Sequence, residues 1–250
     1  MNRISIVGAG PGAIDLLTLR AFERIQNAEV LIWTDSLISP EIVNLAPKNC
    51  LKIKTSSLTL EEILEILITE SKKGKQVVRL HDGDPCLYGA ISEQICGLAE
   101  AGIDVDVIPG ISAYQAAATS LKKELTIPGL VQTIVLTRAP GRTGMPEKEA
   151  LENLASLRAT LCLYLSARHV EEAEEILLNH YLPETPVAIG YRVGWKDEWL
   201  QIVDLKDMAS ISREKKLIRT TLYIISPALS KTKQRSKLYS PTHQHLFRPT

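Results

Sequence analysis

The chain has 250 residues, of which 45% are hydrophobic, and it carries 29 basic and 29 acidic residues. This composition excludes disorder of the whole chain and supports a sizeable core, in one large domain or two smaller ones. Because the net charge is zero, no overall field attracts nucleic acid or an anionic membrane, and an anionic substrate requires a local basic cluster. We expect neither nucleic acid nor a membrane as a partner.

The start of the chain runs directly into a strand-like segment and lacks the features of a signal peptide. No apolar run reaches the roughly 18 residues of a membrane span. The four cysteines are widely separated, without the paired spacing of a zinc site or a redox dithiol. We therefore expect a cytoplasmic protein with reduced thiols and no metal site.

Apolar, β-branched runs alternate with segments of helical period in the first half of the chain, which is typical of βα units and a largely parallel sheet. The predicted strands are residues 4–7, 29–34, 50–54, 76–80 and 105–108. The predicted helices are residues 14–25, 60–72 and 114–120, and Gly74 stands where the second should stop.

A Pro-Gly pair at Pro128-Gly129 interrupts this alternation, and a new set of strands follows. The predicted strands are residues 133–137, 160–166, 186–191, 199–204 and 221–226, with a helix at 170–179. We predict an N-terminal α/β domain at 1–127, a C-terminal α/β domain at 128–230 and a basic tail at 231–250.

A glycine-rich run, Gly8-Ala9-Gly10-Pro11-Gly12, follows the first strand and precedes a helix. Glycines at this place allow a tight turn and let a ligand approach backbone N–H groups. The run also matches a dinucleotide fingerprint, with Asp35 after the second strand. A generic loop, a dinucleotide site and a site for another cofactor all remain open for this motif.

Two further glycine turns follow predicted strands. His81 to Gly89 contains Gly83-Asp84-Pro85 and two carboxylates able to bind a ribose or an ammonium group, although Gly-Asp-Pro is also good turn chemistry. Pro109-Gly110-Ile111-Ser112-Ala113 offers small side chains and a hydroxyl before a helix. Since ligands of open α/β sheets bind at the carboxyl ends of strands, the three turns predict one shared cofactor crevice.

Taken in order, these three loops resemble the signature loops of the tetrapyrrole (corrin/porphyrin) methyltransferase family, and the likeness spans nearly the whole chain. Segments at 125–129, 137–143 and 191–198 and the ending at 236–248 resemble the branch that methylates C-11 of precorrin-4 or cobalt-precorrin-4 in cobalamin synthesis. Lys196 departs from that pattern, since proline is usual there, and Asp82 replaces a small residue.

The resemblance implies two αβα domains with S-adenosylmethionine in a cleft between them, in a homodimer that binds a tetrapyrrole. The cofactor contacts carried over by position are Pro11, Asp82, Gly83, Asp84, Leu87, Ser112, Ala113, Leu165, Val193 and Thr221. Asp35 and Lys54 resemble an acid/base pair of the uroporphyrinogen methyltransferase relatives.

A precorrin carries many carboxylates, which calls for fork-shaped basic donors. The candidate substrate contacts are Arg138, Arg142 and Arg192, with Arg168 and His169 considered beside them. The alternatives are another tetrapyrrole methyltransferase of the same family, a nicotinamide-dependent oxidoreductase and a non-catalytic cofactor-binding protein. The sequence leaves open whether the substrate ring carries cobalt.

Overall fold

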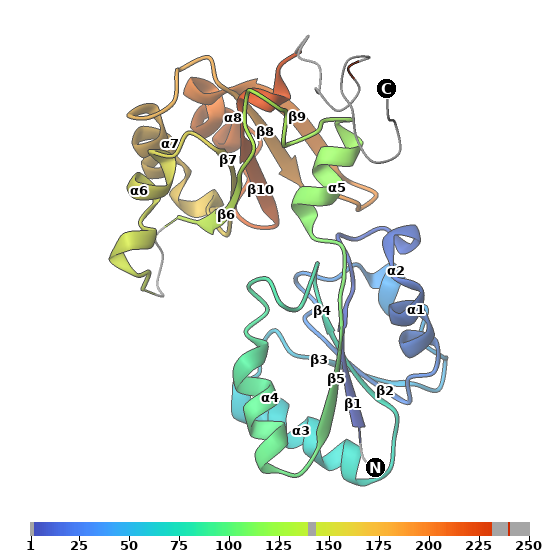
Figure 1. Cartoon of the computed structure of the whole chain (residues 1–250). Helices are drawn as coiled ribbons and strands as arrows, with labels where there is room; N and C mark the ends of the chain where they lie inside the picture. Colours follow the sequence, from blue (N-terminus) through green and yellow to red (C-terminus); the bar gives the residue numbers. More distant parts are fainter. Residues whose placement is uncertain (1–2, 140–143, 232–239, 241–250) are drawn as a thin grey trace. The chain divides into compact units, whose positions relative to one another are not determined.

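A computed structural model describes residues 3–139, 144–231 and 240, which fall into two compact units (Figure 1). Unit 1 holds the chain up to Ala116 together with residues 192–198, and unit 2 holds residues 117–191 and the chain from Trp199 onward. None of the helices in these described ranges is both long and apolar enough to cross a membrane.

Unit 1 is built on a five-stranded parallel sheet with the strand order β3-β2-β4-β1-β5. The strands are β1 (Arg3–Gly8), β2 (Val30–Trp33), β3 (Leu51–Lys54), β4 (Val77–His81) and β5 (Asp104–Ile108). The helices are α1 (Leu19–Gln26), α2 (Pro40–Val43), α3 (Leu60–Lys72) and α4 (Ile91–Glu100), and α5 (Ala113–Ser120) spans the change of unit. One core cluster joins the sheet to α1 and α2, and another joins it to α3 and α4, so helices cover both faces (Figure 1).

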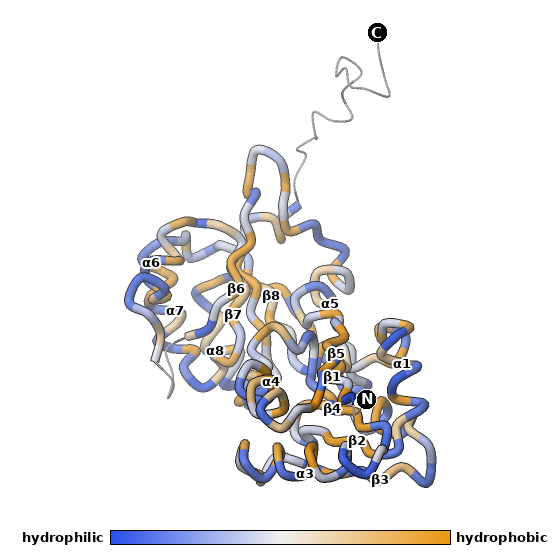
Figure 2. The backbone as a smooth tube through the Cα atoms, turned by 60° about the horizontal axis from the view of Figure 1, so that its bottom comes forward, coloured by the Kyte–Doolittle hydropathy of each residue, from blue (hydrophilic) through white to orange (hydrophobic). Residues whose placement is uncertain are grey.

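Helix α3 confirms the predicted bounds because its end signals are strong. The Thr59 hydroxyl accepts a hydrogen bond from the Glu62 N–H, and the Glu62 carboxylate accepts one from the Thr59 N–H. Ile63 and Leu67, one turn apart, are buried, and the hydropathy along α3 alternates accordingly (Figure 2). The helix stops before Gly74, which has φ +78°.

The helix predicted at 14–25 is instead a 3-10 turn, η1 (Ile14–Leu16), followed by α1. Thr18 separates the two, because its extended backbone and its hydroxyl, which accepts from the Ala21 N–H at 3.1 Å, form the N-cap of α1. Neither α2 nor α4 is predicted from the sequence pattern. α2 has only one turn, and α4 begins after Ala90 (φ +48°) without a side-chain cap.

Unit 2 contains a mixed five-stranded sheet with the order β6-β7-β10-β8-β9. Its strands are β6 (Ile134–Arg138), β7 (Thr160–Tyr164), β8 (Pro186–Tyr191), β9 (Trp199–Asp204) and β10 (Thr221–Ile225), at the predicted places. Only β6 and β7 pair in parallel. The helices α6 (Leu151–Ala155), α7 (Val170–Leu178) and α8 (Met208–Glu214) share one core cluster with the strands, and short 3-10 turns η2 (Glu147–Glu149), η3 (Ala167–His169), η4 (Leu205–Asp207) and η5 (Pro227–Leu229) connect the elements.

The change of unit after Ala116 lies within α5, earlier in the chain than the expected boundary at 127/128. The segment after α5 packs in unit 2: the Leu125 carbonyl accepts a hydrogen bond from the Thr160 hydroxyl at 2.9 Å, and Ile127 is buried in a cluster with Ala228. The expected tail at 231–250 lies outside the described residues except for Lys231 and Ser240.

Candidate functional site

The parallel sheet of unit 1 brings its five carboxyl ends to one edge. Every unit 1 position predicted from sequence, outside residues 192–198, lies at or just after one of these strand ends: Asp35, Lys54, Asp82, Gly83, Asp84, Leu87, Pro11, Ser112 and Ala113. This is the edge at which open α/β sheets bind ligands. The topology therefore gathers residues that are far apart in sequence.

The first and second glycine loops are joined by backbone hydrogen bonds. Gly10 and Gly83 form an isolated bridge, in which the Gly10 N–H donates to the Gly83 carbonyl at 3.1 Å and the Gly83 N–H donates back at 2.8 Å. Both residues have positive φ, +66° and +56°. Glycine adopts this conformation without the steric cost that a Cβ atom imposes. The backbone geometry of the bridge therefore favours glycine at both positions.

Asp84 joins the second loop to the third. Its Oδ1 accepts a hydrogen bond from the Cys86 N–H at 2.8 Å, and its Oδ2 accepts one from the Gly110 N–H at 3.0 Å. The first bond is an Asx turn and the second connects the ends of β4 and β5. Both oxygens of this predicted cofactor ligand therefore already hold backbone N–H groups.

The first and third loops meet without side chains between them. A Cβ atom on Gly8 would lie 2.6 Å from the Gly110 nitrogen, and one on Gly110 would lie 2.1 Å from the Gly83 carbonyl oxygen. Real Cβ atoms do not approach backbone this closely, so the three loops require glycine at both positions.

Residues 192–198 add a further wall to unit 1, although they lie between β8 and β9 in sequence. The Trp195 ring packs on the first loop so closely that a Cβ atom on Gly12 would lie 2.4 Å from its Cδ1. Arg192, a predicted substrate contact, forms an ion pair with Asp197, and its guanidinium carbon lies 4.4 Å from the centroid of the Trp195 ring. Val193, a predicted cofactor contact, is buried.

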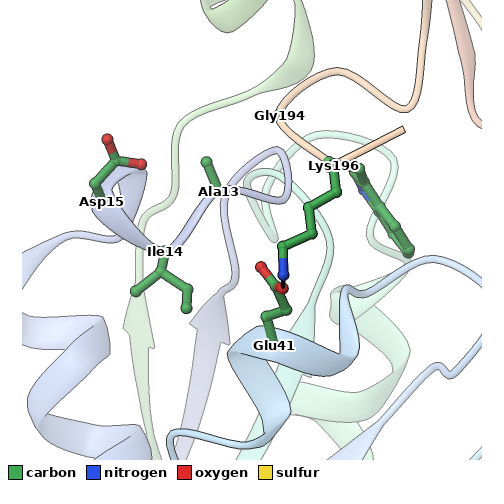
Figure 3. A pocket seen from close by; sticks show the side chains of 7 residues that line it. Ala13, Ile14, Asp15, Glu41, Gly194 and Lys196 are labelled. Carbon is green, nitrogen blue, oxygen red and sulfur yellow. Dashed lines mark ion pairs between the residues drawn. The ribbon is translucent and has the colours of Figure 1, made fainter. Parts of the chain in front are cut away.

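A pocket of about 450 Å³ opens between this segment, residues 13–15 after the first loop, and α2. It is lined by Ala13, Ile14, Asp15, Glu41, Gly194, Trp195 and Lys196. The Lys196 ammonium forms an ion pair with the Glu41 carboxylate, whereas the Asp15 carboxylate points away from that pair (Figure 3). Lys196, the departure from the family pattern, thus has a defined acidic partner.

Asp35 and Lys54 lie beside each other at the ends of β2 and β3, with 3.9 Å between the Asp35 Oδ2 and the Lys54 Nζ. A hydrogen bond from the Ser56 side chain, with backbone hydrogen bonds and the Lys54 charge, lowers the pKa of Asp35 below its usual value. The second oxygen, Oδ1, is buried without a hydrogen-bond partner among the described residues. The pair predicted from sequence is therefore an ionised carboxylate next to an ammonium group.

A buried polar cluster around Arg79 and His81 lies under this edge, and the sequence pattern does not predict it. Arg79 and His81 both lie on β4 and are 4% and 7% exposed. The Arg79 guanidinium donates to Thr34, Thr55 and Gln94. Burial lowers the pKa of His81 to about 3, so this imidazole is neutral, and its Nε2 has no hydrogen-bond partner among the described residues. An arginine inside the buried strand run Val77-Val78-Arg79-Leu80 is the signal that would have found the cluster.

In unit 2, Arg138, Leu165 and Thr221 also reach one sheet edge, because Arg138 pairs with Tyr164 and Thr221 starts the antiparallel strand β10. Leu165 is 69% exposed and has φ +54°, and Thr220, next to Thr221, has φ +56°. Left-handed backbone costs a residue with a Cβ atom about 1–2 kcal/mol, and such residues cluster at ligand sites.

The remaining predicted substrate contacts are less defined. Arg142 lies outside the described residues. Arg138 donates through Nη2 to the Gly144 carbonyl at 2.9 Å. Arg168 and His169 are exposed on η3.

Comparison with known proteins gives the family. The model of the tetrapyrrole (corrin/porphyrin) methylases matches residues 3–209. The chain belongs to the tetrapyrrole methylase family. Among curated members, it is 40% identical to the cobalt-precorrin-4 C(11)-methyltransferase of Methanocaldococcus jannaschii, over 99% of this chain and 96% of that protein. It is 38% identical to the precorrin-4 C(11)-methyltransferase of Pseudomonas aeruginosa, over 98% of each.

Solved structures of tetrapyrrole methylases support the same family assignment. A cobalt precorrin-4 methyltransferase matches with a TM-score of 0.89 and 35% identity, over 92% of this chain and 97% of that chain. A uroporphyrin-III C-methyltransferase of Thermus thermophilus, complexed with S-adenosylhomocysteine, matches with a TM-score of 0.74 and 27% identity, over 91% and 93%. The predicted family and its α/β, two-domain class III methyltransferase fold are confirmed, and the family depends on S-adenosylmethionine.

Proposed function

We propose that this tetrapyrrole methylase transfers a methyl group from S-adenosylmethionine to C-11 of precorrin-4 or cobalt-precorrin-4 during construction of the corrin ring. The observation that carries the proposal is the identity of 36–40% to curated precorrin-4 and cobalt-precorrin-4 C(11)-methyltransferases, over at least 98% of this chain. The glycine loops of unit 1 support the same conclusion, because the family assignment accounts for all three, whereas a dinucleotide site accounts only for the first.

The groups at the unit 1 edge fit the cofactor. Its ribose and ammonium groups need acceptors, and the Asp82 side chain directly after β4 offers a carboxyl group, whose pKa is raised by desolvation. The cofactor must also approach the backbone closely, which Gly10 and Gly83 allow because they carry no side chain. The proposed contacts are Pro11, Asp82, Gly83, Asp84, Leu87, Ser112, Ala113, Leu165, Val193 and Thr221. When bound, the cofactor supplies a methyl group on a sulfonium centre.

The chain itself must orient the ring carbon and remove a proton after attack. Asp35 can accept this proton because its carboxylate is ionised at neutral pH, and its lowered pKa makes it a weak base. The Lys54 ammonium, 3.9 Å away, favours the charged form of Asp35. We propose Asp35 and Lys54 as the acid/base pair, and Arg138, Arg142 and Arg192 as donors to the substrate carboxylates.

The test combines isothermal titration with S-adenosylhomocysteine and a mass-spectrometric assay on precorrin-4, cobalt-precorrin-4 and uroporphyrinogen III. We expect binding, and a gain of one methyl group on a precorrin-4 species but not on uroporphyrinogen III. Asp35→Asn and Lys54→Met should bind the cofactor product normally and lose turnover. Absence of binding would exclude the cofactor, and methylation of uroporphyrinogen III alone would move the chain to another branch.

The homodimer implied by the family resemblance and the cytoplasmic location expected from the sequence features stay predictions. Sedimentation equilibrium of the full chain measures the first directly, with a mass of twice 27.6 kDa expected. Fractionation of cells that express the chain measures the second.

A further inference from the structure

Arg79 is a buried cation whose side-chain hydrogen bonds within the described residues all go to uncharged groups. It occupies the middle of β4, the central strand of the unit 1 sheet, and is 4% exposed. Its Nε donates to Gln94 Oε1 at 3.3 Å, its Nη1 to Thr55 Oγ1 at 3.2 Å and its Nη2 to Thr34 Oγ1 at 3.4 Å. Burial lowers the pKa of Arg79 to about 10, so the guanidinium is still charged at neutral pH.

The Asp82 carboxylate favours the charged form of Arg79 electrostatically, but no ion pair reaches the guanidinium among the described residues, and a buried charge without one is costly. Stability alone therefore does not explain this residue. Two of the three acceptors are sequence neighbours of the proposed acid/base pair. Thr34 immediately precedes Asp35 and Thr55 immediately follows Lys54. One rigid guanidinium thus holds both neighbours of the proposed acid/base pair.

The two threonines also bind each other and the backbone. Their hydroxyl oxygens lie 3.2 Å apart, and the Thr55 hydroxyl donates to the Trp33 carbonyl at 3.3 Å. On the other side, the Gln94 amide donates to the Ala90 carbonyl at 3.2 Å, which connects Arg79 to the loop between β4 and α4. Arg79 therefore stands between the ends of β2 and β3 and the second glycine loop.

We propose that Arg79 is a positioning residue, which fixes the separation and direction of Asp35 and Lys54 through Thr34 and Thr55. This inference rests on the proposed function, since it assumes that Asp35 and Lys54 act in methyl transfer. The planar guanidinium reaches three acceptors in fixed directions, whereas a lysine ammonium at the same place is a single point donor. Arg79→Lys keeps the charge and loses the geometry.

The kinetic test compares Arg79→Lys with Glu70→Gln in the full-length protein. Glu70 is a matched control: it is also a buried charged residue of unit 1, but its ion pairs with Lys73 and Lys75 lie near the start of β4. We expect Arg79→Lys to lower kcat at least tenfold with KM and S-adenosylhomocysteine binding changed less than threefold, and Glu70→Gln to leave kcat near the wild-type value.

A second variant separates positioning from general loosening of the fold. In an Asp35→Asn background, Arg79→Lys should lower kcat less than twofold further, because the pair that Arg79 positions has already lost its carboxylate. A full additional tenfold loss in that background, or an unchanged kcat in Arg79→Lys alone, would overturn the proposal.

A spectroscopic readout keeps the proposal testable even if no precorrin is methylated, an outcome that would count against the proposed function alone. In protein labelled at aspartate carboxyl carbons, the Asp35 resonance is assigned by its loss in Asp35→Asn. We expect Arg79→Lys to shift this resonance at neutral pH and Glu70→Gln to leave it in place. An unmoved Asp35 resonance in Arg79→Lys contradicts positioning, whatever the turnover.

Discussion

The Asp84 carboxylate accepts a hydrogen bond from the Gly110 N–H at 3.0 Å, and this bond ties the loop after β4 to the loop after β5. Its other oxygen closes a turn onto Cys86. The aspartate that sequence resemblance assigns to the cofactor is therefore also a structural link of the site.

This link predicts a graded effect of substitution. Asp84→Asn can keep the turn onto Cys86 with its one carbonyl oxygen but cannot also accept from Gly110, so we expect a loss of about 1–2 kcal/mol in unfolding free energy. Asp84→Ala loses both bonds and should cost more. Chemical denaturation measures both variants, and equal stability of Asp84→Asn and wild type would show that the bond to Gly110 contributes nothing.

The contact between Gly110 and Gly83 predicts that even one methyl group is too large. Gly110→Ala places a Cβ atom 2.1 Å from a carbonyl oxygen, so the loops must separate, at a cost of about 1–3 kcal/mol and with loss of S-adenosylhomocysteine binding. Gly144→Ala, where a Cβ atom meets nothing within 4 Å, is the control. Thermal unfolding and titration calorimetry compare the two, and normal binding by Gly110→Ala would contradict the packing argument.

Buried His81 predicts that stability falls in mild acid. Its pKa is about 3 in the folded chain against an ordinary value of 6.5, so below pH 6.5 the unfolded chain takes up a proton that the folded chain refuses. Stability from this group is present above pH 6.5 and is lost as the pH falls toward 3, by about 2 kcal/mol between pH 7 and pH 5.

The measurement is denaturant unfolding of wild type and His81→Gln at both pH values. All other titrating groups are common to the two proteins, so the variant should lose about 2 kcal/mol less on going from pH 7 to pH 5. The same pH dependence in both proteins would mean that His81 is not the group responsible.

Strained Leu165 predicts that stability and binding change in opposite directions. Leu165→Gly relieves a left-handed backbone and gives up little buried surface, so we expect unfolding free energy to rise by up to about 1 kcal/mol. If Leu165 contacts the cofactor, S-adenosylhomocysteine binding should weaken severalfold. Lys216→Gly, at another exposed residue with φ +56°, should share the gain and keep full affinity. Unchanged affinity in Leu165→Gly would remove this residue from the site.

The sequence by itself determined the strands, the glycine loops and the family, because short stretches of neighbouring residues indicate each of them. β-branched runs formed strands at all ten predicted places, and the capping box at Thr59 fixed the start of α3. Local signals failed where the deciding interaction was not local. The helix predicted at 14–25 broke at Thr18, and α4 began without a capping side chain.

Only the tertiary structure decided what the predicted site residues contact. A parallel sheet carries Asp35 and Lys54 to the edge that also holds Asp84, and no spacing along the chain encodes that meeting. The role of Arg79 was hidden for the same reason. Its three acceptors come from segments 15 to 45 residues away, and hydrogen bonds over such separations form only once the sheet and α4 have packed.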